Sequence, residues 1–181
     1  MTYEIARKLA EQSYQHWVSY ELFSFNFFLL IIVNVIFYSI WLKLLDKSRI
    51  SHLLLIGALA AVGYLIGDIF LFGFFGVAEY KVSLTPVEPP FLILSVTVGP
   101  IIIMLIEQYI STWKGYLLWA SICMAFLTFV ILPIYSLVGI FQLHNWNYFY
   151  HFLCILTIGL IVRVVFLWIM KIEQRHHSSG N

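Results

Sequence analysis

Charged side chains are scarce in this sequence. Only 10% of its 181 residues are Asp, Glu, Lys or Arg, whereas an ordinary soluble domain has about 25%. Hydrophobic residues make up 62%, which is more than a soluble core needs. The formal net charge is +1, too small for the basic surface that nucleic-acid binding requires. These proportions predict an integral membrane protein that does not bind nucleic acid.

Motifs for catalysis and cofactor binding are also missing. The sequence has no GxSxG, HExxH, GxGxxG or phosphate-binding lysine loop, and no CxxC. Its two cysteines, Cys123 and Cys154, lie inside hydrophobic segments, where we expect reduced packing residues. The sequence thus gives no support for an enzyme, a metal site or a cofactor, and it favours a non-enzymatic protein.

We expect no cleavable signal peptide, because none is visible in residues 1–20. Residues 1–20 mix charged residues such as Glu4 and Lys8 with apolar ones such as Leu9 and Trp17. A signal peptide instead has an apolar core directly after its basic residues. We predict that residues 1–20 form an amphipathic helix lying on the membrane surface.

Long hydrophobic runs fill most of the remaining chain. A membrane-spanning helix needs about 20 predominantly apolar residues. The segments that qualify are 21–45, 51–78, 90–112, 115–141 and 147–171. We therefore predict an all-α fold, in which residues 21–172 form a bundle of five transmembrane helices after the interfacial helix. Residues 173–181, which end in HHSSGN, should form a polar tail.

Lysine and arginine are divided unevenly between the two ends of this predicted bundle. One end has six: Lys43, Lys47, Arg49, Lys114, Lys171 and Arg175. The other end has three: Arg7, Lys8 and Lys81. Cytoplasmic loops carry an excess of Lys and Arg. We predict that the N-terminus lies outside the cell and the C-terminus in the cytoplasm.

Three charged residues, Asp68, Glu107 and Arg163, interrupt the apolar segments. An arginine at membrane depth keeps its charge and needs a partner or a wet cavity. Glu107 and Arg163 precede Lys114 and Lys171 by similar spacings, which puts both roughly 10–12 Å from the same end. We predict an ion pair between them, with Asp68 nearer the other end. The pair is either a structural clasp or part of a substrate or proton path.

Small residues surround Asp68. Gly57, Tyr64 and Asp68 fall on one helical face, and Gly63 and Gly67 form a small-residue pair that lets a neighbouring helix approach closely. The pattern favours a packing face. The alternative is that the small residues leave space around Asp68 for water, a proton or a ligand.

Proline interrupts two of the apolar segments, at Pro100 and Pro133. Proline removes one helical hydrogen bond and clashes with the preceding turn. We therefore expect an irregular helix at both positions, and such irregularities often border a cavity.

Aromatic and polar residues cluster before the last apolar segment, in the sequence HNWNYFYH. Trp and Tyr anchor well at a membrane interface, which predicts an interfacial position for Trp146 and Tyr148. His144 and His151 flank the cluster, but zinc needs three or four ligands. We expect both histidines to be interfacial polar anchors. Tyr80, Trp146, Tyr148 and His151 join the three intramembrane charges as candidate binding residues.

A series of residues along the chain forms a recognisable pattern: Asp68, Tyr80, Pro86, Pro100, Glu107-Gln108, Trp146-Asn147-Tyr148 and Arg163. In this pattern the segment from about residue 50 to 172 resembles a family of small uncharacterised multi-pass membrane proteins from spore-forming Gram-positive bacteria, bacilli and clostridia. The stretch NWNYFYHFLCILTIGLIVRVVF carries most of the similarity. The chain departs from the family at Ser95, where an acidic residue is expected, and near Pro133 and Tyr135, where another is missing. The resemblance implies a bacterial plasma-membrane location and no known activity.

Two functional interpretations remain open. The leading one is a non-enzymatic plasma-membrane protein, a partner-binding or envelope component. The alternative is a small transporter, or a module that binds lipid or a small molecule, with a polar interior around Asp68, Glu107 and Arg163. Expected partners are the lipid bilayer and either another membrane protein or further copies of this chain. A wet cavity reaching Arg163 would favour the alternative, and a dry interior the leading interpretation.

Overall fold

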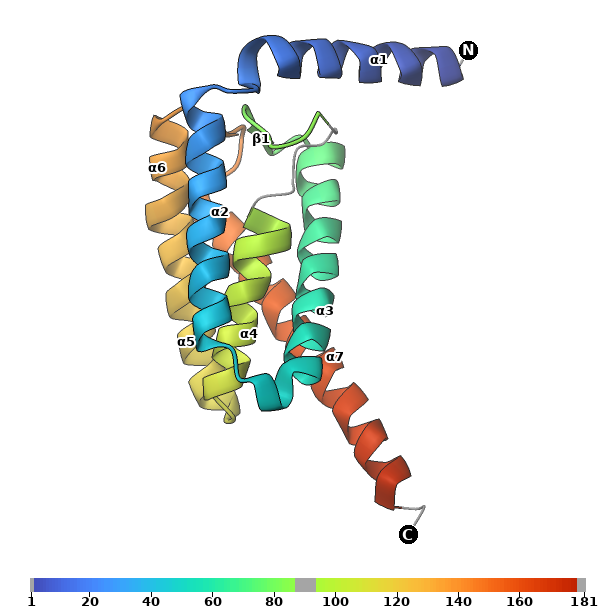
Figure 1. Ribbon diagram of the computed structural model, residues 1–181, viewed down its shortest axis with the longest axis vertical. Coiled ribbons are helices and arrows are strands. Elements are labelled where there is room, and N and C mark those ends of the chain that lie inside the picture. Colours follow the sequence, from blue (N-terminus) through green and yellow to red (C-terminus); the bar gives the residue numbers. More distant parts are fainter. Residues whose placement is uncertain (1, 87–93, 179–181) are drawn as a thin grey trace.

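The computed structural model describes residues 2–86 and 94–178, which are mostly helical (Figure 1). The elements in chain order are α1 (Thr2–His16), η1 (Trp17–Glu21), α2 (Phe25–Leu44), η2 (Lys47–Arg49), α3 (Ile50–Asp68), η3 (Ile69–Phe74), β1 (Ala78–Tyr80), η4 (Leu94–Val98), α4 (Gly99–Tyr109), α5 (Trp113–Phe126), η5 (Leu127–Ile131), α6 (Leu132–Leu137), β2 (Phe141–Leu143) and α7 (Tyr148–Ser178). The segment η2 is a 3-10 turn, and the other η segments are π-helical. The predicted all-α class is confirmed, with one short strand pair added to it.

Within the described residues, four helical stretches are long and apolar enough to cross a membrane: Phe25–Leu44, Lys47–Leu71, Trp113–Leu137 and Tyr148–Arg175. They match four of the five predicted spans, with bounds shifted by a few residues. The remaining predicted span, 90–112, is described from Leu94 onward, and its apolar helix Val96–Tyr109 is shorter. Residues 87–93 of that prediction lie outside the described part of the chain. These helices identify the chain as a helical membrane protein.

The bundle has two distinct ends (Figure 1). One end, termed the α1 end, carries α1 and the strand pair. The other, termed the basic end, carries the α2–α3 and α4–α5 connections, and α7 projects beyond it. The six lysines and arginines grouped by the orientation argument belong to these connections and to the last turns of α7. The structure therefore keeps this cationic group at one end.

The predicted polar tail is partly helical. Helix α7 continues to Ser178, past the predicted boundary at residue 172, and only residues 179–181 of the tail fall outside the described part. The reason is local, because Lys171, Glu173, Gln174 and Arg175 are good helix formers.

Helix α1 lies across the bundle, roughly perpendicular to the long helices (Figure 1). It is fastened through η1: the indole N–H of Trp17 donates to the Ser83 carbonyl at 3.0 Å. The Glu21 carboxylate accepts from the Ser83 amide at 2.7 Å and from its hydroxyl at 3.1 Å. Phe23, with a φ of +63°, turns the chain from η1 into α2. An orientation across the bundle is the one that an interfacial helix requires.

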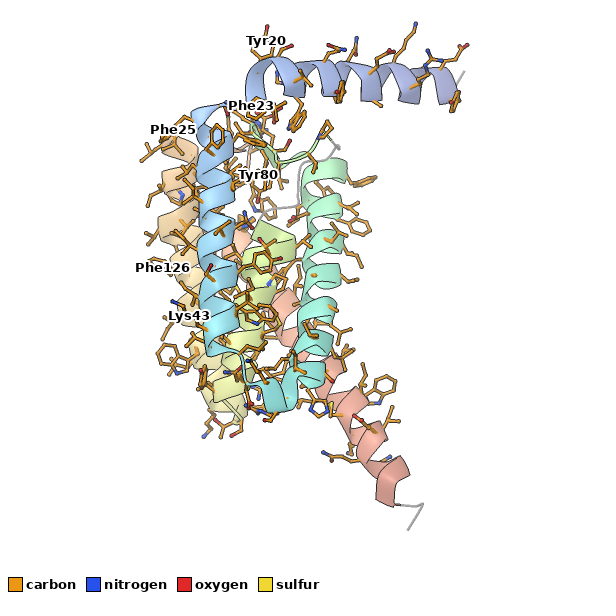
Figure 2. All side chains as sticks on the ribbon, viewed as in Figure 1. Tyr20, Phe23, Phe25, Lys43, Tyr80 and Phe126 are labelled. Carbon is orange, nitrogen blue, oxygen red and sulfur yellow. The ribbon has the colours of Figure 1, made fainter. Side chains whose placement is uncertain are left out.

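The strands β1 and β2 pair antiparallel, with Tyr80 opposite Phe141 and Ala78 opposite Leu143. The second span was predicted to stay helical to residue 78, but the helix ends at Phe74 and Gly76 turns the chain at a φ of +59°. The strand pair ties the segment after α3 to the segment after α6. It also fixes Tyr80 at the α1 end, between α2 and α3 in the view of Figure 2, whereas Lys43 lies at the basic end.

Glycines let α3 approach α7 closely. A Cβ atom on Gly67 would lie 2.7 Å from Cδ1 of Ile158, and one on Gly63 would lie 3.0 Å from its Cγ2. These two helices belong to the larger apolar core, which also includes α4 and α5, while a smaller core lies under the strand pair. The predicted packing role of the Gly63–Gly67 pair is confirmed.

A π-helical segment precedes each of the two intramembrane prolines. η4 runs directly into Gly99-Pro100, and η5 into Leu132-Pro133. Because proline has no N–H, the carbonyl four residues earlier cannot close an α-helical turn, and a π turn passes that bond to the next amide along. The predicted irregularity at both prolines is confirmed, as a widened turn rather than a sharp kink.

Candidate functional site

Arg163 is the largest fully buried side chain among the described residues, with 1% of its surface exposed. Its Nε lies 3.1 Å from Oε2 of Glu107, whose side chain is 13% exposed. Within the described chain neither of these two atoms has a hydrogen-bond partner, so the contact is an ion pair without hydrogen-bond geometry. The predicted pairing of α4 with α7 through these residues is confirmed.

The Arg163 guanidinium also binds the backbone turn between α4 and α5. Its terminal nitrogens donate to the carbonyls of residues 110–112, at 3.4, 3.0 and 3.3 Å in chain order. Its carbon Cζ lies 4.0 Å from the ring centroid of Tyr116 and 4.7 Å from that of Trp113. The carbonyls at a helix C-terminus carry partial negative charge, and aromatic faces attract cations. Arg163 thus contacts α4, the α4–α5 turn and α5, which is the arrangement that a structural clasp requires.

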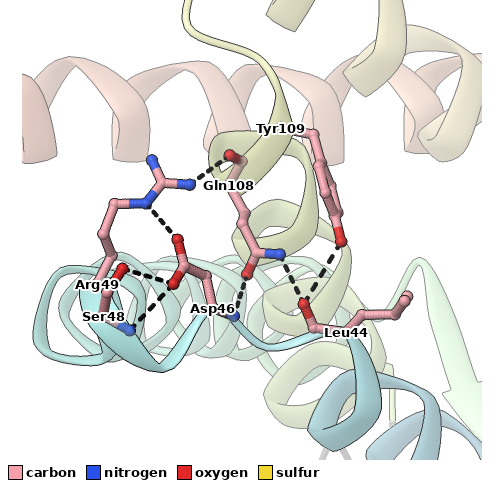
Figure 3. A network of polar contacts seen from close by, with 6 residues as sticks. All are labelled: Leu44, Asp46, Ser48, Arg49, Gln108 and Tyr109. Atoms are coloured by element: carbon pink, nitrogen blue, oxygen red, sulfur yellow. Dashed lines mark hydrogen bonds and ion pairs between the residues drawn. The ribbon is translucent and has the colours of Figure 1, made fainter.

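Gln108, the neighbour of Glu107 in α4, holds the α2–α3 connection at the same end (Figure 3). Its side-chain amide donates to the Leu44 carbonyl at 2.7 Å and accepts from the Asp46 amide at 3.0 Å. Its backbone carbonyl accepts from Nη2 of Arg49 at 2.6 Å. Two adjacent residues of α4 therefore fasten both α7 and the α2–α3 connection to one helix end.

Asp46 organises the short turn that begins α3. Its carboxylate accepts from the Ser48 amide at 3.0 Å and from the Ser48 hydroxyl at 2.6 Å, and it pairs with Nε of Arg49 at 3.0 Å. These bonds, those from Ser48 first and from Arg49 next, lower the pKa of Asp46 below its ordinary value. The ionised form is therefore the one that holds this turn.

A second polar group gathers toward the α1 end, where Asp68, Tyr80 and His151 line one cavity of about 50 Å³. Asp68 is 7% exposed and His151 6% exposed. A water needs about 10–15 Å³ of such space, so the cavity has room for only a few small atoms. Its apolar walls include Met124, Leu127, Ile131, Leu132, Ile155 and Ile158.

Two π-helical segments line this cavity, and a third ends next to one of its lining residues. The segment η3 begins directly after Asp68 and contributes Leu71, η4 ends directly before Gly99, and η5 contributes Leu127 and Ile131. Segments of this kind are rare and frequently occur at functional sites. The backbone therefore departs from regular helix on several sides of the same small space.

Tyr80 presents a protonated hydroxyl to this region. Burial, and then the negative charge of Asp68, raise the pKa of Tyr80 well above its ordinary value. The phenol therefore stays neutral at physiological pH and can donate a hydrogen bond. The lining residues that the structure describes thus combine one carboxylate with Tyr80, Tyr64 and His151, and they include no lysine or arginine.

An apolar groove of about 490 Å³ borders the cavity. Its lining comes from α2, η4–α4 and α5–η5–α6, and includes Val33, Phe37, Val98, Ile102, Phe126 and Tyr135. Leu127 and Ile131 line both the groove and the Asp68 cavity. The two spaces are therefore neighbours that share a wall of η5.

The alternative interpretation of the sequence placed Asp68, Glu107 and Arg163 around one polar interior. The structure instead separates Asp68 from the other two charges. Neither Glu107 nor Arg163 lines the Asp68 cavity. Arg163 follows His151 by 12 residues in α7, which is about 18 Å along a helix. The carbonyls of the α4–α5 turn hold Arg163 at the basic end, together with Glu107 at the last turn of α4.

The remaining predicted site residues are also divided. Trp146 packs against a neighbouring tyrosine and Tyr148 against the smaller core, and neither lines the cavity. His144 pairs with Glu79 at 3.3 Å on the surface, consistent with a polar anchor. The same expectation is wrong for His151, which is buried because the β2 segment packs against the start of α7.

Sequence reasoning missed two residues of the clasp end, Gln108 and Tyr116. Gln108 was visible as a polar side chain in an apolar helix, next to Glu107. Tyr116 is fully buried, donates to the Gly159 carbonyl at 3.1 Å and lies under the Arg163 guanidinium. No sequence signal shows which of many aromatic residues will lie under an arginine.

Comparison with known proteins finds no match to this chain among family models, curated proteins or solved structures. Within the described residues, no group of three or more His, Cys, Asp or Glu side chains is placed to hold a metal ion. The two polar centres are therefore the features from which a function can be inferred.

Proposed function

We propose that this chain is a non-enzymatic membrane protein that binds a small ligand in the Asp68 cavity. The observation that carries the proposal is the convergence of Asp68, Tyr80 and His151 on one cavity that two π-helical segments, η3 and η5, also line. Ligand sites typically combine apolar walls with a few convergent polar groups, as this lining does. The proposed binding site is therefore smaller than the polar interior inferred from the sequence, and it includes only Asp68 and its neighbours. The Glu107–Arg163 pair has a structural role in this proposal.

Binding accounts for the cavity better than catalysis does. Covalent catalysis needs a nucleophile beside a base that activates it. The described part of the lining has His151 as a base but no serine, threonine, cysteine or lysine. The chemistry that the lining supports is recognition by charge, hydrogen bonding and aromatic contact.

The proposed location is a bacterial plasma membrane, with α1 on the outer surface and the basic end in the cytoplasm. The six-to-three division of lysine and arginine supports this orientation. The position of α1 across the bundle supports its place at the interface. In this arrangement the segment that contains α4 is the fifth span, beside the four long apolar helices.

Binding of a partner protein is a second candidate function. Helix α7 projects beyond the basic end, and residues 171–175 are all exposed. This extension offers a helical surface outside the membrane. It is compatible with ligand binding at the opposite end, so the two candidates can be tested separately.

A cavity-filling substitution tests the ligand proposal whatever the chemical identity of the ligand. Ile155→Trp fills the cavity from α7, and Leu153→Trp places the same ring on the exposed side of the same helix. We expect mass spectrometry of extracts from the purified proteins to find a small molecule that is enriched with the wild type and Leu153→Trp and is depleted with Ile155→Trp. Identical extracts from three proteins with intact folds would contradict the proposal.

A further inference from the structure

We infer that the Asp68 cavity and the adjacent apolar groove together bind a single-chain amphiphile with a small primary ammonium head group. This inference rests on the proposed function and names its ligand class. The head group lies in the cavity beside Asp68, and the hydrocarbon chain lies in the groove between α2 and α5.

Charge selects the head group. Among the described residues that line the cavity, Asp68 is the one acidic side chain and none is a lysine or arginine; Asp68 is 7% exposed. A buried carboxylate repels a phosphate or carboxylate head and attracts a cation. Tyr64 and Tyr80 line the same cavity, and tyrosine ring faces attract ammonium groups while their oxygens accept hydrogen bonds from them.

Size limits the head group further. The cavity measures about 50 Å³, which suits a primary ammonium and the first carbon attached to it. A sugar, a phosphodiester or a bulky quaternary ammonium would need more room than the lining leaves. The site therefore favours a primary amine.

The groove accommodates the hydrocarbon chain of the ligand. Its volume of about 490 Å³ falls within the ~300–1,000 Å³ range of ligand pockets, and its lining is apolar apart from Tyr135. Among the described elements, the main contacts of α2 are with η4 and α4, and the groove lies between these elements and α5. An apolar space offers water few hydrogen bonds, so it is unfavourable for water. A hydrocarbon chain from the bilayer fills the same space favourably.

The shared wall between the two spaces allows them to act as one site. Leu127 and Ile131 line both, so the partition between the carboxylate and the groove consists of side chains of η5. Occupation of both spaces requires these two side chains to change rotamer. A ligand entering from the bilayer between α2 and α5 would then reach Asp68 without crossing the polar basic end.

The test compares three probes of known chemistry on the full-length protein in detergent: dodecylamine, methylammonium and dodecanol. Binding is followed as the shift in unfolding temperature with probe concentration. We expect dodecylamine to bind most tightly. Asp68→Asn should weaken it about 10- to 100-fold, the usual effect of losing a charged hydrogen bond. Val33→Trp, which fills the groove from α2, should also weaken it, and Ile32→Trp on the exposed face should not.

Each other outcome overturns the inference. Equal binding of methylammonium and dodecylamine would show that the groove does not contribute to binding. If dodecanol binds as tightly as dodecylamine, or if Asp68→Asn has no effect, charge does not contribute to recognition of the ligand. If Asp68→Asn does not fold, the Val33→Trp and Ile32→Trp pair still decides the role of the groove. Failure of all three probes would reject this ligand class, while the extraction experiment with Ile155→Trp would still test whether the cavity binds a ligand.

Discussion

Arg163 and Asp68 are both buried charges, but their surroundings differ in kind. Arg163 meets a carboxylate, three backbone carbonyls and two aromatic rings, so its polar groups have partners within the fold. Asp68 lies in the wall of a cavity whose other walls are mostly apolar. A buried cation held by groups from several elements stabilises one arrangement of helices, whereas a carboxylate that lines a cavity can also contact a ligand.

The first prediction concerns the Glu107–Arg163 pair. Arg163→Met should lower the free energy of unfolding by about 3–5 kcal/mol, because it strands Glu107 and removes a cation from three carbonyls. Glu107→Gln should lower it by about 3 kcal/mol, since Arg163 keeps its carbonyl and ring contacts. The double variant should lose clearly less than the sum of the two losses, as measured by unfolding in detergent.

Arg163→Lys is the matched control for charge alone. Lysine keeps the positive charge but has neither the flat face nor the forked donors of arginine. It should therefore recover only part of the stability lost in Arg163→Met. Full recovery by lysine, or strict additivity in the double variant, would contradict the clasp described for this end.

The second prediction concerns Asp46 and pH. The folded state lowers the pKa of Asp46, so its bonds to Ser48 and Arg49 contribute stability above the unfolded pKa of about 3.9. That contribution disappears as the pH falls through the lower folded pKa. The difference in unfolding temperature between the wild type and Asp46→Asn should therefore narrow as the pH falls from about 7 to about 3. A difference that stays constant or widens would show that the carboxylate charge does not hold this turn.

At the scale of helices and strands, hydropathy and spacing predicted much of the fold. Apolar length located four spans, and the Gly63–Gly67 spacing predicted the close face of α3. Matched depth predicted the Glu107–Arg163 pair, because the cost of a lone charge in lipid restricts its possible partners.

The strand pair and the cavity could not be predicted from hydropathy and spacing. The strand pair forms because segments 60 and more residues apart meet at the α1 end, and no local pattern records that meeting. The cavity depends on how η3 and η5 lie next to one another in space, with the end of η4 nearby. Proline positions predicted that two of these turns would be irregular, but not that they would meet beside Asp68.

The third prediction tests the α3–α7 interface. Gly67→Val should lower the free energy of unfolding by about 1–3 kcal/mol, because Cβ would already lie 2.7 Å from Ile158. Ala58→Val, on the exposed side of α3, is the matched control and should have little effect. Thermal unfolding in detergent measures both. Similar losses at the two positions would indicate a general intolerance of valine in α3 rather than a close helix contact.

At the scale of the whole molecule, the two ends have different constructions. The basic end is a network of ion pairs and carbonyl contacts that joins α2, α4, α5 and α7. The α1 end combines an interfacial helix, a strand pair and the cavity. This division suits a protein whose rigid end holds the helices while the other end receives a ligand.

The fourth prediction concerns orientation in the membrane. In a variant without Cys123 and Cys154, a cysteine replacing exposed Glu79 should react with a membrane-impermeant thiol reagent added outside intact cells. A cysteine replacing exposed Ser48 should react only after the membrane is opened. The six-to-three distribution of lysine and arginine predicts this result. The reverse labelling pattern would invert the proposed topology.

The separation of structural charge from ligand-facing charge is tested most directly by comparing Asp68→Asn with Glu107→Gln in ligand-free detergent. Both changes remove one buried carboxylate charge and keep the side-chain shape. Glu107→Gln is predicted to lower the free energy of unfolding by about 3 kcal/mol, since it breaks the ion pair to Arg163. Asp68→Asn keeps an oxygen that can accept a hydrogen bond, and it is predicted to change this free energy by no more than about 1 kcal/mol. An Asp68→Asn variant destabilised as much as Glu107→Gln would contradict the account, because Asp68 would then hold the fold together.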